Sequence, residues 1–381
     1  MLVFFKPISE TKVQPIVLVD YTRSDEQYSF SEIQKKVFST SKDLKKIPDL
    51  TKLEIYSLNY RVIYSHSGVN PASSLKTSAR IEVDNAPSAL VNLINLKQFT
   101  SQESALALES AVKAIIDPEV QFPSCVMILK NGSNVLADND IIRNFIIYNT
   151  AFNYESRRIT STLIISGASF SSMVIGLNTA VNVLTTKPLV SQLQSSLSST
   201  KYLFKADESI MSITPKVERY YPPATLNNIL SNVAKDYGLY IDIDDDTKIV
   251  YIKSLNPKNK PKALANKTFC FRGKAPGAKL ISNFSVLDYS TGTFETEIED
   301  VKIFDSIIVY DDSNAALLFE NFIEFPAPIG KIKAYQFYLQ EYTYLDDRNQ
   351  TKLKITATNN WVVSNFKLGN FLENAIYKGA F

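Results

Sequence analysis

The chain has 381 residues, of which 45% are hydrophobic and 21% charged, and its formal net charge is +2. This composition is ordinary for a folded globular protein and excludes a mainly disordered chain. The small net charge excludes a dedicated non-specific nucleic-acid binder, because such binding needs a strong positive field. At roughly 150 residues per domain, the length predicts two or three domains.

Cysteine and glycine usage narrows the chemistry further. Cys125 and Cys270 lie far apart without CxxC spacing, so we expect buried thiols, not a zinc site or a disulfide framework. Neither GxGxxG nor GxxxxGK[ST] occurs, which argues against a phosphate-binding loop. The N-terminal stretch lacks a signal-peptide pattern, and "MVIGLNTAVNVL" is shorter than the roughly 20 residues that a membrane span needs. We therefore expect a soluble protein made in a reducing cytosol, with no cofactor and no membrane span.

Residues 1–165 are predicted to form a first tube-like antiparallel β-barrel domain. Alternating runs such as "QPIVLVDY" and "KLEIYSLNYRVIYS" predict strands, and "SARIEVDNAP" predicts another strand that ends in an Asn-containing turn. "TSQESALALESAVKAIIDP" predicts a helical insertion near residues 100–117, since Thr100 and Glu103 fit a capping box. Asn131 and Gly132 lie between two apolar runs and predict a hairpin. "IIRNFIIYNTAFNYESRRITSTLIISG" predicts two more strands around a polar turn.

Residues 166–200 are rich in serine and are predicted to be a linker with short helices. One apolar stripe at helical spacing consists of Val174, Leu177, Val181 and Leu184. A second stripe after Pro188 consists of Leu189, Leu193 and Leu197. A self-association helix is the alternative, but the stripes are too short to specify a coiled coil.

Residues 201–265 are predicted to be a small α/β module. In "TLNNILSNVAKDYGLYIDIDDDTKIVYI" an apolar helical face follows the N-cap candidate Thr225 and ends at Gly238. Two strands joined by an acidic turn follow, and "KYLFKADESIMSITP" predicts a further strand of the same sheet. Residues 266–381, with several alternating runs, are predicted to be a second tube-like antiparallel β-barrel domain. The expected fold is therefore mainly β with α+β parts.

The aspartates of the acidic turn invite a comparison with a calcium-binding loop. Counting from Asp242, Asp244 and Asp246 fit an EF-hand, but Thr247 replaces the required glycine and Lys253 replaces the last acid. We interpret the cluster as a solvated hairpin tip. His66, the only histidine, is interpreted as a structural residue in a loop between strands. No catalytic, cofactor-binding or metal-binding residue is predicted.

The segment "FETEIEDV" carries a different pattern. On a strand, Glu295, Glu297 and Glu299 would share one face, because successive side chains alternate. One interpretation is the solvated face of an antiparallel sheet. The other is an acidic strip on a channel lumen or a subunit interface, where it pairs with lysines of a neighbour or repels a passing polyanion.

The order of these parts resembles the tail hub (baseplate hub) proteins of long-tailed bacteriophages and related contractile injection systems. The stretches that carry the resemblance are "SARIEVDNAP", "SCVMILKNGSNVLADNDIIRNF", "TLNNILSNVAKDYGLYIDIDDDTKIVYI" and "SNFSVLDYSTGTFETEIEDVKIFDSIIV". They cover most of the chain in layout but are degenerate patterns, not invariant signatures. The insertion near residues 100–117 and the stretch 166–200 depart from the simplest hubs.

The resemblance implies a structural, non-enzymatic protein of the virion tail. It implies a homotrimeric ring that joins the tail tube protein to a spike, tail-tip or fibre protein, contacts other baseplate proteins and lets DNA pass transiently during host entry. Two alternatives stay open at this stage. The helix–strand–strand module also resembles ring-building domains of bacterial secretion systems, and a glycan-degrading tail enzyme needs only two suitably spaced acids.

Overall fold

The computed structural model describes residues 2–6, 16–19, 54–69, 76–95, 124–129, 141–155, 160–169, 171, 180–245, 247–253, 267–271, 278–287, 291–311, 322–326, 331–347 and 350–358. The predicted helix near residues 100–117, the Asn131-Gly132 turn and Asp246 lie outside these residues. The chain divides into two compact units. The first comprises Met1–Tyr64, Thr77–Ile175 and Leu345–Thr351, and the second comprises Ser65–Lys76, Gly176–Tyr344 and Lys352–Phe381.

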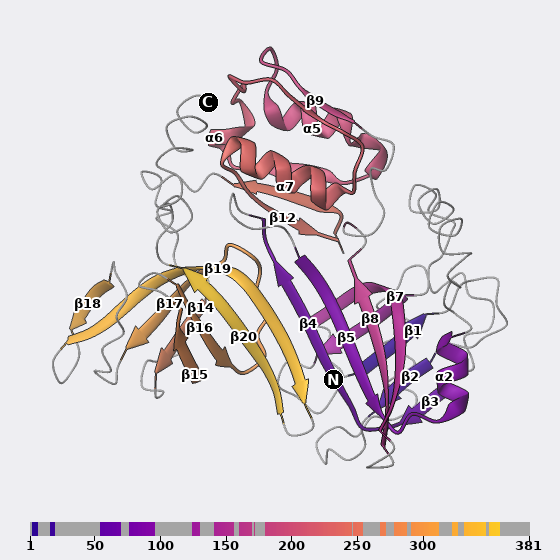
Figure 1. Ribbon diagram of the computed structural model, residues 1–381. Coiled ribbons are helices and arrows are strands. Elements are labelled where there is room, and N and C mark those ends of the chain that lie inside the picture. Colours follow the sequence, from indigo (N-terminus) through magenta and orange to yellow (C-terminus); the bar gives the residue numbers. More distant parts are fainter. Residues whose placement is uncertain are drawn as a thin grey trace. The chain divides into compact units, whose positions relative to one another are not determined.

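The first unit is a sheet with one described α-helix. Its elements are β1 (Leu2–Lys6), β2 (Ile16–Val19), β3 (Glu54–Ser57), β4 (Tyr60–Ser67), β5 (Lys76–Asp84), α2 (Ser88–Asn95), β6 (Ser124–Leu129), β7 (Ile141–Glu155) and β8 (Thr160–Ala168). The strands follow the order β3-β2-β1-β6-β7-β8-β5-β4 (Figure 1). The strands predicted from "QPIVLVDY", "KLEIYSLNYRVIYS" and "SARIEVDNAP" are confirmed. The last residues of β4, from Ser65 on, belong to the second unit.

Alternation explains which face of these strands is buried. Along β4 the residues at every second position are buried, including Val62, and β8 repeats the pattern with Leu163 and Ile165. The predicted turn after β5 is present, and Asn85 adopts a left-handed conformation with φ 50° there. Its backbone N–H donates to the Ser161 carbonyl at 2.7 Å. The short helix α2 after this turn has no counterpart among the predicted elements.

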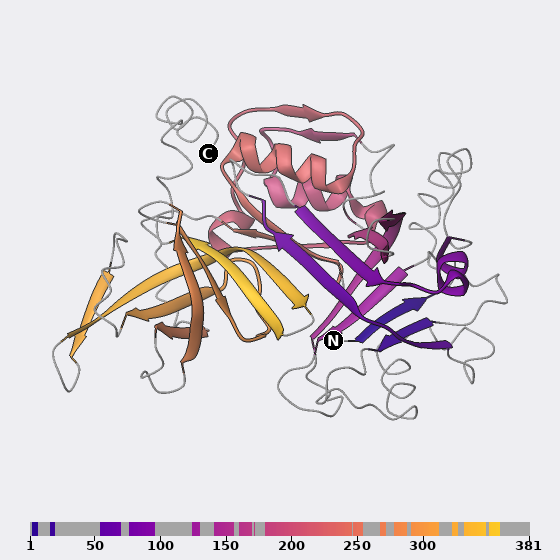
Figure 2. The same ribbon diagram turned by 60° about the horizontal axis from the view of Figure 1, so that its bottom comes forward.

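The second unit contains the α/β module. Its elements are β9 (Val181–Val183), α5 (Leu189–Ser196), η2 (Ser198–Thr200), β10 (Leu203–Ala206), α6 (Glu208–Met211), β11 (Arg219–Tyr221), α7 (Leu226–Tyr237), β12 (Tyr240–Asp244) and β13 (Ile249–Lys253). The sheet order is β10-β13-β12, and β9 pairs with β11 in a separate ribbon. Helix α7 lies between the three-stranded sheet and this ribbon (Figures 1 and 2).

Helix α7 begins and ends where its sequence predicts. The Thr225 side chain accepts a hydrogen bond from the Asn228 backbone N–H at 3.3 Å, and Gly238 closes the helix with φ 63°. The predicted apolar face is fully buried: Leu226, Ile229, Leu230, Val233 and Ala234. Strand β10 joins the sheet parallel to β13, so the predicted third strand is also confirmed.

The stretch predicted to be a linker with short helices contains both a helix and a strand. The second stripe forms α5, whose Leu189 and Leu193 are completely buried. Within the first stripe, Val181–Val183 form strand β9, not a helix, because they find a partner in β11 and bury alternate residues. Local spacing alone could not reveal that partner, which lies almost 40 residues further on.

The remaining strands close a barrel. They are β14 (Lys267–Phe271), β15 (Lys279–Val286), β16 (Thr291–Thr296), β17 (Ser306–Asp311), β18 (Phe322–Pro326), β19 (Lys331–Asp347) and β20 (Gln350–Thr358). The order β17-β14-β15-β16-β20-β19 returns to β17, because β17 pairs with β19 (Figure 2). Strand β14 runs parallel to both neighbours, a departure from the predicted antiparallel arrangement. The predicted class, mainly β with a small α part, is confirmed.

Aromatic side chains fill the barrel interior. The rings of Phe269 and Phe294 lie 5.2 Å apart between centroids, and Phe337 and Tyr335 on β19 are also buried. Cys270 is a buried free thiol, as expected. The barrel therefore has a packed core built from strands far apart in sequence.

Candidate assembly surface of the barrel

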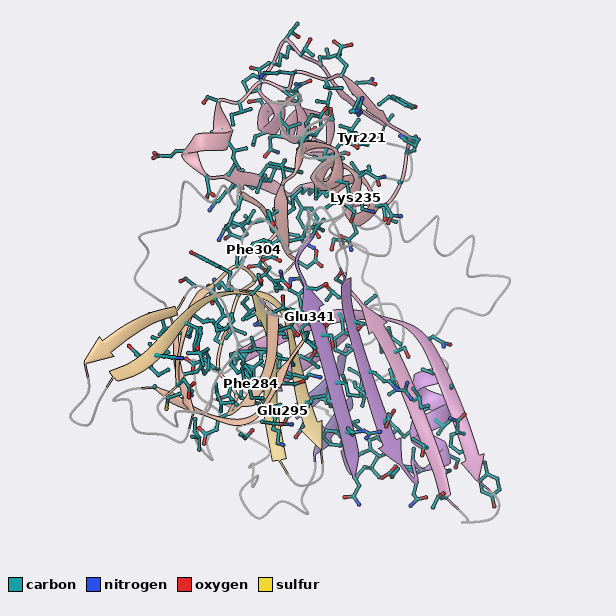
Figure 3. All side chains as sticks on the ribbon, turned by 60° about the vertical axis from the view of Figure 1, so that its left-hand side comes forward. Tyr221, Lys235, Phe284, Glu295, Phe304 and Glu341 are labelled. Atoms are coloured by element: carbon teal, nitrogen blue, oxygen red, sulfur yellow. The ribbon has the colours of Figure 1, made fainter. Side chains whose placement is uncertain are left out.

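Glu295 lies on the face of β16 opposite Phe294. Phe294 points into the barrel core, so Glu295 lies in the row of Thr291 and Thr293, two buried threonines. The hydroxyl of Thr293 lies 3.3 Å from that of Thr356 across the strand pair. Lys352 Nζ lies 3.2 Å from Glu295 Oε2 (Figure 3 labels Glu295). This row is a cross-strand ladder of hydroxyls that ends in an ion pair.

The other two glutamates do not lie on the strand. Strand β16 ends at Thr296, whose hydroxyl donates to the Leu280 carbonyl at 2.9 Å, and the chain bends at the next residue. The expectation that Glu295, Glu297 and Glu299 share one strand face is therefore wrong. The cause is that pairing with β15 and β20 ends here, which alternation within "FETEIEDV" does not show.

Glu299 lies between two lysines of its own chain. Lys267 Nζ is 2.9 Å and Lys279 Nζ is 3.0 Å from its carboxylate oxygens, and the side chain is 21% exposed. Partial burial opposes ionisation, but the hydrogen bonds and charges of both lysines outweigh it and hold the pKa of Glu299 below its usual value. The Tyr344 hydroxyl fixes the backbone by donating to the Glu299 carbonyl at 3.1 Å.

Glu297 differs from Glu295 and Glu299 in its exposure and its contacts. It is exposed, and within the described part of the chain it has no ion pair. Two of the three predicted residues are thus neutralised within the chain, and one carboxylate faces outward. A lumenal or subunit-interface role for these residues stays a proposal.

His66 lies in strand β4 and not in a loop, which corrects the sequence interpretation. The strand continues past Ser65 because it finds a partner in β19: the Ser65 and Thr343 hydroxyls are 2.9 Å apart, and the Gly68 N–H donates to the Gln340 carbonyl. His66 Nε2 lies 2.8 Å from Asp242 Oδ1, and both side chains are nearly buried. Its ring packs against Tyr342 at 5.5 Å between centroids.

The same end of β4 also reaches the α/β module. Val69 and Ile241 exchange backbone hydrogen bonds of 2.7 and 2.9 Å. Gly68 allows this close approach, since a Cβ atom there would lie 2.5 Å from Ile303 Cγ2 and 2.9 Å from Phe304 Cζ. His66 and Asp242 are separated by 176 positions, so only the three-dimensional fold reveals their pairing. The pair thus links the end of β4 to β12.

The acidic turn behaves as a hairpin tip, as predicted. Asp244 accepts a hydrogen bond from the Thr247 N–H at 3.1 Å, and Asp245 accepts one from the Tyr202 hydroxyl. Asp242, by contrast, lies in β12 and faces His66. Across the described residues, no group of three or more His, Cys, Asp or Glu side chains is placed to bind a metal ion. Among those residues, no helix combines the length and the apolar character needed to cross a bilayer.

Comparison with known proteins finds likeness only at the level of structure. No family model and no curated protein sequence matches the chain. A tail protein from Neisseria meningitidis MC58 matches with a TM-score of 0.46 at 11% identity, over 79% of this chain and 93% of that one. The 43 kDa tail protein of prophage MuSo2 from Shewanella oneidensis matches with a TM-score of 0.46 at 8% identity, over 80% and 95% of the two chains.

A third similar structure comes from a secretion system. The E. coli c3393 protein, described as a component of the type VI secretion system with structural similarity to the T4 bacteriophage tail proteins gp27 and gp5, matches with a TM-score of 0.43 at 7% identity. The match covers 80% of this chain and 74% of that one. These three structures are two tail proteins and a component of the type VI secretion system.

Proposed function

We propose that the chain is a structural hub of a phage tail or a tail-like injection machine. In this proposal three copies form a ring that joins the tail tube to a spike, tail-tip or fibre protein, in contact with other baseplate proteins. DNA passes through the ring during host entry, and the assembled protein resides in the virion tail. The chain acts by shape and assembly, without bond-making chemistry.

One observation carries the proposal: a single chain holds two β-rich units, and the second closes a six-stranded barrel. Two β units in one chain mean that three copies present six such units, which suits a hexameric tube above a trimeric hub. The order of β unit, α/β module and barrel supports the resemblance drawn from the sequence. The division at residues 1–165, 166–200, 201–265 and 266–381 belongs to the same proposal.

Glu297 has a defined place in this proposal. As the exposed member of the three glutamates, it faces the lumen or a neighbouring copy, whereas Glu295 and Glu299 stabilise the barrel through lysines. Glu297→Lys should therefore disturb assembly or genome passage without unfolding the barrel. Unchanged particle yield and infectivity would contradict this assignment.

Mass photometry of the purified chain tests the proposal. A species of three times the chain mass supports the hub. A ring of twelve or more copies supports the alternative of a secretion-system ring, which the strand–helix–strand–strand module of β10, α7, β12 and β13 favours. A monomer that degrades glycans would overturn both proposals.

A further inference from the structure

Strand β7 is paired on both sides for only part of its length. Its ladder with β6 ends at Ile146, whereas its ladder with β8 continues to Glu155. From Ala151 to Tyr154 every residue is exposed, so neither face of this segment packs on a core. Phe152 is 49% and Tyr154 63% exposed. Figure 1 shows β7 and β8 as a long ribbon, and within the described part of the chain nothing pairs with the far edge of residues 151–155.

Strand β15 in the second unit repeats this situation. Its ladder with β14 covers only Lys279 to Ile281, whereas its ladder with β16 continues to Val286. Ser282, Asn283 and Ser285 are exposed, and Leu287 directly after the strand is 60% exposed. Among the described residues, the side of residues 282–287 away from β16 has no ladder. Among the described residues, each unit thus contains a strand whose second half has a ladder on one side only.

Two sheet edges of the α/β module are covered from within. The side-chain amide of Gln194 on α5 accepts from the Phe204 N–H at 2.8 Å and donates to the Tyr202 carbonyl at 3.2 Å, which covers β10. Val69 exchanges two hydrogen bonds with Ile241 and so occupies the edge of β12. Proteins with a solvent-exposed strand edge commonly protect it with a charged residue, often lysine, or with proline. Residues 151–154 and 282–287 contain none of these, and the charge on the open edge of β7 is Glu155 at its end.

We propose that the open edge of β7 in one copy pairs with the open edge of β15 in the next copy. The occupant is a second copy of this chain because one chain carries both edges, one in each unit. Such a head-to-tail contact between two different surfaces repeats from copy to copy and closes a ring where the rotation permits. Backbone hydrogen bonds hold the strands, and the aromatic side chains on β7 and Leu287 directly after β15 cover each other.

This inference rests on the proposed function for the ring but specifies the contact that builds it. It also explains the exposed aromatic residues, which a ribbon of two strands cannot bury. If β7 of one copy paired with β7 of another, the chain would form dimers and not rings. If a strand of a different protein paired with these edges, the chain purified alone would be a monomer.

Cysteine cross-linking tests the contact directly in the full chain with Cys125→Ser. Tyr154→Cys is combined in one chain with Asn283→Cys, Ser285→Cys or Leu287→Cys in turn, because these positions would lie on the same face of the joined sheet and sample the register. After mild oxidation, at least one combination should give covalent dimers and trimers on a non-reducing gel. Tyr154→Cys alone should stay monomeric on the gel; a covalent dimer from it would show the symmetric contact and overturn the inference.

A charge variant provides the second readout. Phe152→Lys/Tyr154→Lys should reduce the trimer fraction in mass photometry at least tenfold, with unchanged circular dichroism. Tyr220→Lys, at a residue 62% exposed on β11, is the matched control and should leave the trimer intact.

The outcomes separate this inference from the proposed function. A trimer that forms no cross-link and is unaffected by the charge variant overturns the edge contact, but it still supports the proposed hub function. Cross-links into open chains without a discrete trimer support the contact and contradict the ring. Monomers without cross-links overturn both.

Discussion

The strand edges of the α/β module are covered by hydrogen bonds from the same chain, whereas part of β7 and part of β15 have no such cover among the described residues. In the module, Gln194 and Val69 cover the outer strands with hydrogen bonds from the same chain. Within the described residues, Ala151–Tyr154 and the second half of β15 have a ladder on one side only, and neither segment carries a charge. The difference suggests that the module is complete as a single copy, whereas the β-rich units are completed by assembly. The following mutations test this distinction.

The largest effect is expected in the barrel core, away from any edge. Phe294→Ala removes a buried ring that contacts Phe269 and Phe284, and it should lower the free energy of unfolding by about 3–5 kcal/mol. Urea denaturation of the chain, followed by circular dichroism, measures this. Leu287→Ala, at an exposed position, should change the free energy by less than about 0.5 kcal/mol while weakening the ring. Equal losses in both variants would show that β15 is not an open edge.

The junction inside the second unit comes next. Gly68→Ala brings a Cβ atom within 2.5 Å of Ile303 Cγ2, so strand β4 or the loop at Phe304 must shift. The expected loss is about 1–3 kcal/mol, typical of overpacking. Leu203→Ala at an exposed site of β10 is the control. If thermal unfolding of Gly68→Ala matched that of the unchanged chain, the close approach of Gly68 to Ile303 and Phe304 would be refuted.

A smaller effect is expected at the start of α7. Thr225→Ala removes the oxygen that accepts the Asn228 N–H and should cost about 1 kcal/mol. Thr225→Ser keeps an accepting oxygen and should be nearly neutral. Because this change lies in the self-contained module, the trimer fraction should stay constant at protein concentrations where the chain is folded. A loss of trimer with retained helicity would place the module in the subunit contact.

The smallest effect concerns the charge network. Glu299→Gln should cost less than about 1 kcal/mol near neutral pH, as expected for partly exposed ion pairs. The pKa of Glu299 is lower in the folded chain than its ordinary value of 4.5, so its contribution is present above that value and is lost as the pH falls through the folded pKa. The stability difference between the unchanged chain and Glu299→Gln should therefore shrink in acid. Denaturant titrations at pH 7 and below pH 4 check this, and a constant difference would contradict the lysine contacts.

The sequence predicted local structure well and long-range pairing poorly. Helix α7 was predictable because its cap, apolar face and terminating glycine all lie within about 14 residues. Val181–Val183 and His66 were misassigned because their partners, β11 and Asp242, are distant in the chain. The glutamates show the same limit: alternation predicted the outward direction of Glu295, but the end of β16 and the lysines of β14, β15 and β20 come from tertiary pairing.

The parallel position of β14 and the closure of β17 on β19 were likewise invisible locally. Strand identity follows from alternation, but strand order depends on which edges meet, and that is decided by the whole core. The open edges of β7 and β15 became apparent only once the ladders on both sides of each strand were known.

A high-resolution cryo-electron microscopy map of the purified assembly tests the central claim most directly. We predict a threefold ring in which residues 151–155 of each copy form a backbone ladder with residues 282–287 of the next. A map of a single copy, or of a ring in which both segments remain bare to solvent, would contradict it.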